Sequence, residues 1–197
     1  MLIPLIIVAA VLLITAAVAA FAYNRLIALR NRYLNAYAQI DVQAKRRYDL
    51  IPALVEASKG YLAHERQTLE GVMSARTAAA AANQVAAATP GDRAAMTSIG
   101  GAESALAGAL GRFTAVAEAY PQLKANQQLS QLMDELAATE NRISFARQFF
   151  NDCVMDYNTA IQSFPTVIVA RPFGFAPATF FEVHASDRQT PVVANLR

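Results

Sequence analysis

The chain has almost none of the residues from which metal centres and nucleophilic active sites are usually built. Its single cysteine, Cys153, excludes an internal disulfide and a cage of thiolate ligands. The two histidines, His64 and His184, stand far apart, and neither has the preceding Glu-x-x partner that di-iron sites of helical bundles use. No glycine-rich stretch is followed by the Lys-Ser/Thr pair of a phosphate-binding loop. We therefore expect no metal, no cofactor and no catalytic residue.

Net charge is also small. The 17 basic and 15 acidic residues leave a net charge of +2 at pH 7, and the two signs are interleaved along most of the chain. Nucleic-acid binding normally depends on a clustered excess of Lys and Arg that neutralises phosphates. The sequence therefore predicts no nucleic-acid partner.

Residues 2–23 contain no charged side chain at all. A helix rises about 1.5 Å per residue, so about 20 apolar residues cross the roughly 30 Å of bilayer hydrocarbon. A cleaved signal peptide is the alternative, because Ala20-Phe21-Ala22 suits a small-residue cleavage site. However, no basic residue precedes the apolar run, and the run is longer than a signal core. We interpret residues 1–23 as a transmembrane helix, with the lipid bilayer as its partner.

The flanking charges predict the orientation of this helix. Arg25, Arg30 and Arg32 follow the span closely, whereas nothing basic except the α-amino group precedes it. By the positive-inside rule, the arginine flank lies in the cytoplasm. We expect a single-pass protein of the bacterial inner membrane, with its N-terminus outside and its body in the cytoplasm.

Residues 24–164 are expected to form an elongated antiparallel four-helix bundle, so the fold class is all-α. The spanning helix should continue out of the membrane to about Arg47. A break is expected near 48–51, with Asp49 capping the second helix and Pro52 in its first turn. Further breaks are expected at the Thr-Pro-Gly-Asp turn of residues 89–92 and at residues 120–121.

The fourth helix of this bundle carries the clearest pattern. Large apolar residues recur every seven positions, with a row of small residues three or four positions away, which is typical of a coiled-coil-like core seam. The large residues are Leu129, Leu136, Ile143, Phe150, Tyr157 and Phe164. The same helix also carries a row of polar residues, which either fixes the helix register, bonds to a partner chain, or forms an ordinary solvent-exposed face. The row consists of Asn141, Ser144, Gln148, Asn151 and Asn158.

Residues 165–197 form an irregular segment rich in proline and phenylalanine. Three prolines exclude a long helix, and four phenylalanines, Phe173, Phe175, Phe180 and Phe181, are too many for a free linker. The segment either folds back on the bundle, lies in the bilayer interface, or docks on a neighbouring chain.

Several stretches resemble the LemA family of bacterial membrane proteins. They run from Asp41-Val42-Gln43 through Arg46-Arg47-Tyr48-Asp49-Leu50-Ile51-Pro52, from Tyr120-Pro121 to Lys124-Ala125, and from Glu140-Asn141-Arg142 to Arg147. The resemblance extends from the N-terminal anchor to about Glu182. It implies a membrane-anchored, all-helical protein without an established enzymatic activity, and it supports a membrane-organising role.

The sequence thus predicts a non-enzymatic, self-assembling scaffold that organises the bacterial inner membrane or complexes in it. The alternative is an accessory subunit that tethers a separate enzyme or transporter, so that another membrane protein is the partner. The candidate contacts for self-association or a partner come from the polar row and the irregular segment: Asn141, Gln148, Asn151, Phe173, Phe175, Phe180 and Phe181.

The orientation can be tested by labelling. A cysteine placed in the turn at residues 89–92, in a Cys153→Ser background, should resist a membrane-impermeant thiol reagent in intact cells and react after lysis. Ready labelling of intact cells would establish the opposite topology.

Overall fold

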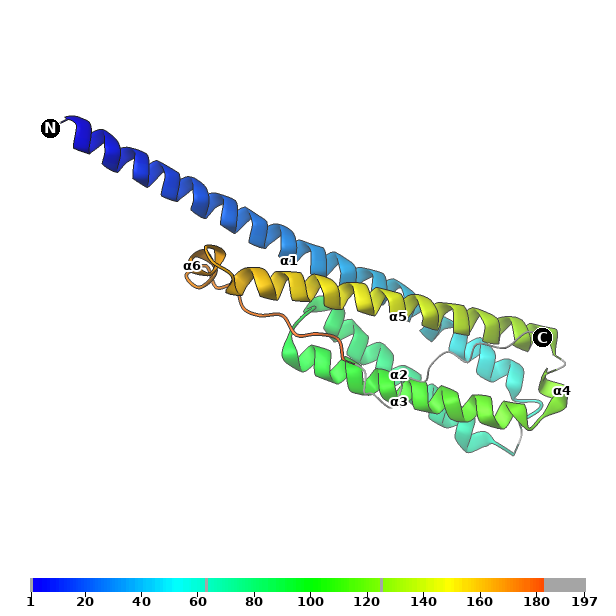
Figure 1. Ribbon diagram of the computed structural model, residues 1–197. Helices are drawn as coiled ribbons and strands as arrows, with labels where there is room; N and C mark the ends of the chain where they lie inside the picture. The colour runs from blue at the N-terminus through cyan, green and yellow to red at the C-terminus, as the bar shows by residue number, and fades with distance from the viewer. Residues whose placement is uncertain (1, 63, 125, 183–197) are drawn as a thin grey trace.

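The structure, a computed structural model, describes residues 2–62, 64–124 and 126–182; residues 183–197 of the predicted irregular segment lie outside this range. Among the described residues all regular structure is helical. Four long helices run alternately up and down, and two short ones accompany them (Figure 1): α1 Leu2–Ser58, α2 Arg66–Ala88, α3 Arg93–Glu118, α4 Pro121–Lys124, α5 Gln127–Gln162 and α6 Thr166–Ala170. The predicted all-α class is confirmed.

Helix α1 has 57 residues and is about 85 Å long at 1.5 Å per residue. Its N-terminal part projects from the bundle, whereas its C-terminal part packs along α5 (Figure 1). Burial begins at Ala22 and then follows a stripe three or four residues apart, through Leu26, Tyr33 and Ile40. One helix therefore carries both the apolar N-terminal segment and a full side of the bundle core.

The break expected near 48–51 is wrong. Helix α1 continues to Ser58, with Asp49 and Pro52 inside it, and the first connection follows at residues 59–65. Proline lacks the N–H that would bond to the Tyr48 carbonyl one turn earlier. In this protein Arg76 Nε, from α2, donates to the Tyr48 carbonyl at 2.9 Å instead. A tertiary hydrogen bond therefore replaces the missing helical one.

The other two breaks lie where they were expected. Asp92 caps α3 by accepting a hydrogen bond from the Ala95 N–H at 3.0 Å, and Gly91 has the positive φ of 84° that the turn requires. Pro121 begins only the four-residue α4, and α5 starts at Gln127 after the capping residue Asn126. The short helix α4 connects α3 to α5, which lie on different sides of the bundle (Figure 1).

The seam predicted on the fourth helix forms the core side of α5. Ile143, Phe150, Cys153 and Tyr157 are buried, and Phe150 contacts the rings of Tyr33 and Tyr37 edge-on. Phe164, the last residue of the predicted repeat, is exposed because α5 ends at Gln162. The core has two parts, one near the projecting segment and one toward α4.

The described part of the irregular segment folds back on the bundle through two asparagines of α5. Asn158 bonds to both the C=O (2.8 Å) and the N–H (2.9 Å) of Ala178, and Asn151 bonds to both backbone groups of Phe181 (3.1 and 2.8 Å). Seven helical residues rise about 10.5 Å, and three extended residues span about 10 Å, so the two spacings match. We refer to this pair of side chains as the asparagine clamp.

The clamp places the rest of the segment along α5 and α3. Tyr157 Oη donates to the Ala176 carbonyl at 3.0 Å, and the Thr179 N–H donates to the Gly91 carbonyl at 2.8 Å. A Cβ on Gly100 would lie 2.5 Å from the Glu182 carbonyl oxygen, so the segment approaches α3 too closely for any larger residue. Phe181 thereby enters the core, with 3% of its surface exposed.

The clamp gives a stability prediction. Asn158→Asp keeps the acceptor but removes the N–H donor, and it places a carboxylate beside the Ala178 carbonyl. We expect a loss of about 1–3 kcal/mol in the free energy of unfolding, measured by urea titration in mild detergent. Asn141→Asp, on the exposed side of the same helix, is the control and should change stability by less than about 0.5 kcal/mol. Equal losses would show that the clamp contributes nothing.

Candidate functional site

The core contains a cluster of charged side chains contributed by three helices. Arg47 of α1 and Glu103 of α3 are 1% and 2% exposed, and they form an ion pair. Arg147 of α5 donates from Nη2 to the same Glu103 oxygen at 2.7 Å, and Arg47 also pairs with the half-exposed Glu140 of α5. Two guanidinium groups and two carboxylates therefore balance each other, which is the condition for keeping charges out of water.

Tyr48 completes the environment of Glu103 by donating its hydroxyl to Oε1 at 2.5 Å. Burial alone would raise the pKa of Glu103, but the charges of Arg47 and Arg147 and the hydrogen bonds from Arg47 and Tyr48 outweigh it and lower the pKa. Burial and the same carboxylate raise the pKa of Tyr48, so its proton stays in place as a donor.

A second hydrogen-bonded chain lies beside this cluster. Tyr37 Oη donates to Asn83 Oδ1 at 3.1 Å, and Asn83 Nδ2 donates to Asp41 Oδ1 at 2.6 Å. These residues lie between the two parts of the apolar core, one ending at Ile40 on α1 and the other beginning at Ala44. We call the combined set the polar layer: Tyr37, Asp41, Arg47, Tyr48, Asn83, Glu103, Glu140 and Arg147.

The Glu103 carboxylate at the centre of the polar layer is fully engaged. Three donors already occupy the Glu103 carboxylate, which leaves it neither a general base nor a free metal ligand. Among the residues that the structure describes, no group of three His, Cys, Asp or Glu side chains could hold a metal ion. Cys153 is buried, and burial raises its pKa, so it is a neutral thiol.

One open cavity of about 600 Å³ lies between the irregular segment and the α2–α3 turn. Arg30 and Arg93 contribute cationic groups to it, and Tyr33, Tyr157 and Phe175 contribute rings. Asp92, which also lines it, is already engaged as the cap of α3. Its lining contains no nucleophile paired with a base.

The structure divides the predicted contact residues into two groups. Asn151 and Phe181 bond to each other, and Phe175 is half-buried with its ring 5.6 Å from that of Tyr23. The remaining four are exposed: Asn141 and Gln148 on the outer side of α5, and Phe173 and Phe180 on the irregular segment. Of the seven predicted contact residues, these four have exposed side chains.

Two features were missed by sequence reasoning, although each had a signal. Exposed apolar residues accompany Asn141 and Gln148 on the outer side of α5: Phe145 (73% exposed), Phe149 and Met155. Residues 141, 145 and 148 are four and three residues apart, and residue 155 lies two turns beyond 148, on the side of α5 opposite the core seam. We call these five residues, Asn141, Phe145, Gln148, Phe149 and Met155, the outer α5 face.

The second feature that sequence reasoning missed is Arg47, which lies three residues after Ala44 and four before Ile51 in the buried stripe of α1.

These observations define an all-helical protein with a candidate membrane helix at its N-terminus, continuous with a bundle that surrounds a polar layer. The LemA family model matches residues 36–194, and the chain belongs to the LemA family. The matched region contains nearly the whole bundle and begins after the apolar segment. The family is not a known enzyme family.

The chain is similar to three magnetosome proteins. It is 34% identical to magnetosome protein MamQ of Magnetospirillum gryphiswaldense over 104 residues, which is 52% of this chain and 38% of that protein. It is 34% identical to magnetosome proteins MamQ 1 and MamQ 2 of Paramagnetospirillum magneticum over 94 residues, 47% of this chain and 34% of each relative. The aligned parts thus span well under half the length of these relatives.

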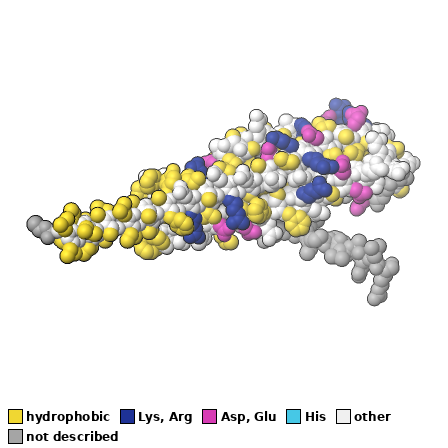
Figure 2. Space-filling view, turned by 90° about the horizontal axis from the view of Figure 1, so that it is seen from above, with side chains coloured by type: hydrophobic (Ala, Val, Ile, Leu, Met, Phe, Trp, Pro, Cys, Tyr) yellow, Lys and Arg dark blue, Asp and Glu magenta, His cyan; other side chains and the backbone are white. Residues whose placement is uncertain are grey.

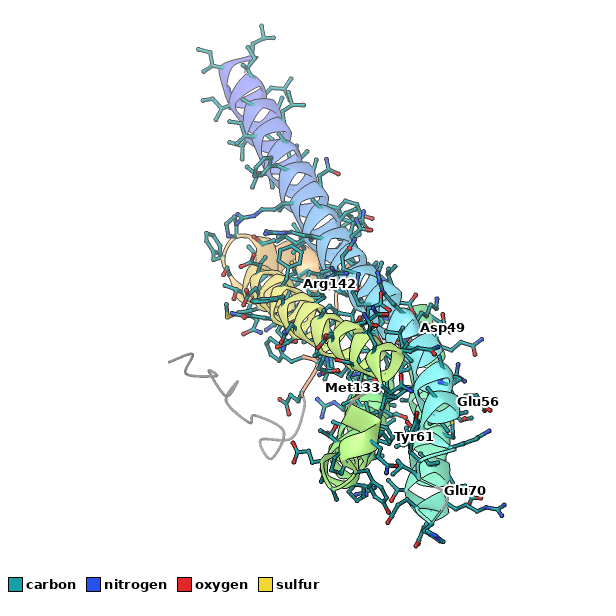
Figure 3. All side chains as sticks on the ribbon, turned by 90° about the vertical axis from the view of Figure 1, so that its right-hand side faces the viewer. Asp49, Glu56, Tyr61, Glu70, Met133 and Arg142 are labelled. Carbon is teal, nitrogen blue, oxygen red and sulfur yellow. The ribbon has the colours of Figure 1, made fainter. Side chains whose placement is uncertain are left out.

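The polar layer predicts a pH-dependent stability. Glu103→Gln keeps the side-chain volume but leaves two buried guanidinium groups with one carboxylate. We expect a loss of about 3–5 kcal/mol in the free energy of unfolding at pH 7, measured by urea titration in mild detergent. The control is Glu70→Gln, because Glu70 points away from the bundle (Figure 3) and should cost less than about 0.5 kcal/mol.

The Glu103→Gln variant should also differ from the unchanged protein in how its free energy of unfolding depends on pH. Because the pKa of Glu103 is lowered in the folded protein, its contribution is fully present above the ordinary carboxyl pKa of about 4.3. That contribution is lost as the pH falls through the lowered pKa of the folded state. The Glu103→Gln protein should therefore lose less stability between neutral pH and strong acid than the unchanged protein. Parallel profiles would contradict the assignment.

Proposed function

We propose that this protein is a non-enzymatic scaffold, anchored in the bacterial inner membrane by α1 and associating with itself through the outer α5 face. The observation that carries the proposal is the junction between an exposed apolar segment and a rigid bundle in one unbroken helix. Each side of that junction supports one half of the function.

The apolar segment supports the anchor. An apolar stretch of 18 residues in α1 has a mean hydropathy of 2.9, and none of this stretch is buried within the protein (Figure 2). Thr15 donates its hydroxyl to the Val11 carbonyl at 2.8 Å, so this polar side chain is satisfied without water. Covering so many exposed Leu, Ile and Val side chains stabilises them by roughly 25 cal/mol per Å², and a bilayer is the partner that covers all sides of a helix.

The rigid bundle supports a scaffolding role rather than catalysis. Helix α1 leaves the apolar segment without a break, and its next turns pack on α5 and α6. The bundle therefore keeps a fixed height and rotation relative to the anchor. Arg47, Tyr48 and Arg147 donate to Glu103 across helices, and these hydrogen bonds stabilise the bundle.

The outer α5 face supports self-association. Phe145, Phe149 and Met155 are exposed next to the amides of Asn141 and Gln148, which is the mixture of apolar and hydrogen-bonding groups found at protein interfaces. Two copies anchored in one membrane share their orientation, so a twofold axis along the membrane normal brings their α5 helices together in parallel. Confinement to two dimensions raises the effective concentration, and weak contacts are then sufficient.

Cross-linking in native membranes tests this function. In a Cys153→Ser background, Gln148→Cys should form a disulfide-linked dimer on mild oxidation, whereas Val85→Cys, on the exposed side of α2, should not. Adding Phe145→Asp should reduce the dimer several-fold by placing a charge in the contact. A monomer that co-purifies with one different protein in fixed ratio would overturn self-association and favour the accessory-subunit alternative.

A further inference from the structure

We propose that residues 164–173, including α6, are a second membrane contact that lies in the lipid interface beside the spanning helix. The inference rests on the proposed anchorage of α1. It assigns to this part of the irregular segment a role in binding lipid, while residues 176–181 hold it to the bundle.

The depth of this segment follows from its contacts with α1. Residues 2–23 rise about 33 Å as a helix, so the edge of the hydrocarbon falls close to Tyr23. The ring of Phe173 lies 5.1 Å from the ring of Tyr23, and α6 packs against α1, where Ala22 is the first buried residue. Any bilayer that covers the apolar segment therefore reaches α6 and Phe173 as well.

The chemistry of the exposed side chains fits that depth. Helix α6 buries Val169 and Ala170 in the core, so an ordinary surface helix would be polar on its other side. Instead Phe164, Ile168 and Phe173 are 80%, 62% and 64% exposed. In Figure 2 hydrophobic side chains continue from the projecting rod onto the adjoining part of the bundle.

Two exposed basic residues are close in sequence to this apolar surface. Arg171 is exposed between Ile168 and Phe173, and Arg25 is exposed two residues after Tyr23. Aromatic rings at the hydrocarbon edge with arginines beside them are typical of membrane interfaces, because a guanidinium group can reach lipid phosphates while its stem stays in apolar surroundings. Because the surface is continuous with the span, lipid is a better occupant than a second copy.

The absence of tryptophan from the sequence makes a direct test possible. Four full-length variants, each with one Phe or Tyr changed to Trp, are reconstituted in vesicles of phosphatidylethanolamine and phosphatidylglycerol containing lipids brominated near the headgroup end of the acyl chain. Phe164→Trp and Phe173→Trp report on the proposed contact. Phe21→Trp reports on the anchor, and Tyr61→Trp, which follows the end of α1 about 52 Å from Tyr23 and lies outside the outer α5 face, is the water-exposed control. Circular dichroism checks that each variant is folded.

We expect the brominated lipids to quench Phe164→Trp and Phe173→Trp to an extent comparable with Phe21→Trp, while Tyr61→Trp is quenched only by aqueous acrylamide. If Phe21→Trp is quenched but the two test variants behave like Tyr61→Trp, the second contact is wrong and the anchorage stands. If the test variants resist both quenchers, protein covers the surface and the inference is also wrong. If Phe21→Trp is not quenched, the proposed anchorage itself fails, and the second contact fails with it.

Discussion

The ion cluster of Arg47, Glu103 and Arg147 is the constraint on which the rest of the bundle depends. Each charge comes from a different long helix, and each is removed from water, so sliding any one helix by a turn would leave a buried charge without its partner. Such a loss costs several kcal/mol, far more than a shift between alanine-rich apolar surfaces would. Helices α2 and α3 are rich in alanine and specify register weakly by packing alone. The polar layer therefore selects one alignment among several that the apolar seams would accept.

Much of the helical architecture could be predicted from the sequence because it depends on local patterns. The seam around Phe150 follows from seven-residue periodicity, and the turn before Asp92 follows from Pro-Gly-Asp, since both signals act within a few residues. The break predicted near 48–51 is wrong because a proline removes one backbone N–H and so leaves the carbonyl four residues earlier without its helical hydrogen bond. Local sequence rules treat that loss as the end of a helix. The group that satisfies the Tyr48 carbonyl is Arg76, which is distant in sequence, so no local pattern could reveal it.

The sequence indicates which residue types are suited to form contacts, but it does not indicate which group each of them contacts. Asn151 and Gln148 look alike in the sequence, yet the first binds the backbone of Phe181 and the second faces outward. The difference comes from the irregular segment, whose extended path has no periodic signal. What the sequence does contain is the seven-residue interval between Asn151 and Asn158, and its meaning becomes clear only when the matching three-residue interval in the segment is known.

The continuity of α1 links these parts to the proposed function. Tyr23 and Arg47 are 24 residues apart in one helix, so Arg47 and its ion cluster lie about 36 Å from the proposed edge of the hydrocarbon. Each residue of an α-helix turns by about 100°, and the rotation of the bundle about the anchor is therefore as fixed as its height. A spanning helix alone would leave the bundle free to tilt, because a single helix has no preferred azimuth in lipid. In the proposed arrangement, helix α6, packed on α1 and followed by the asparagine clamp, would give the molecule one side that faces the membrane. That asymmetry would restrict how the outer α5 face meets a neighbouring copy.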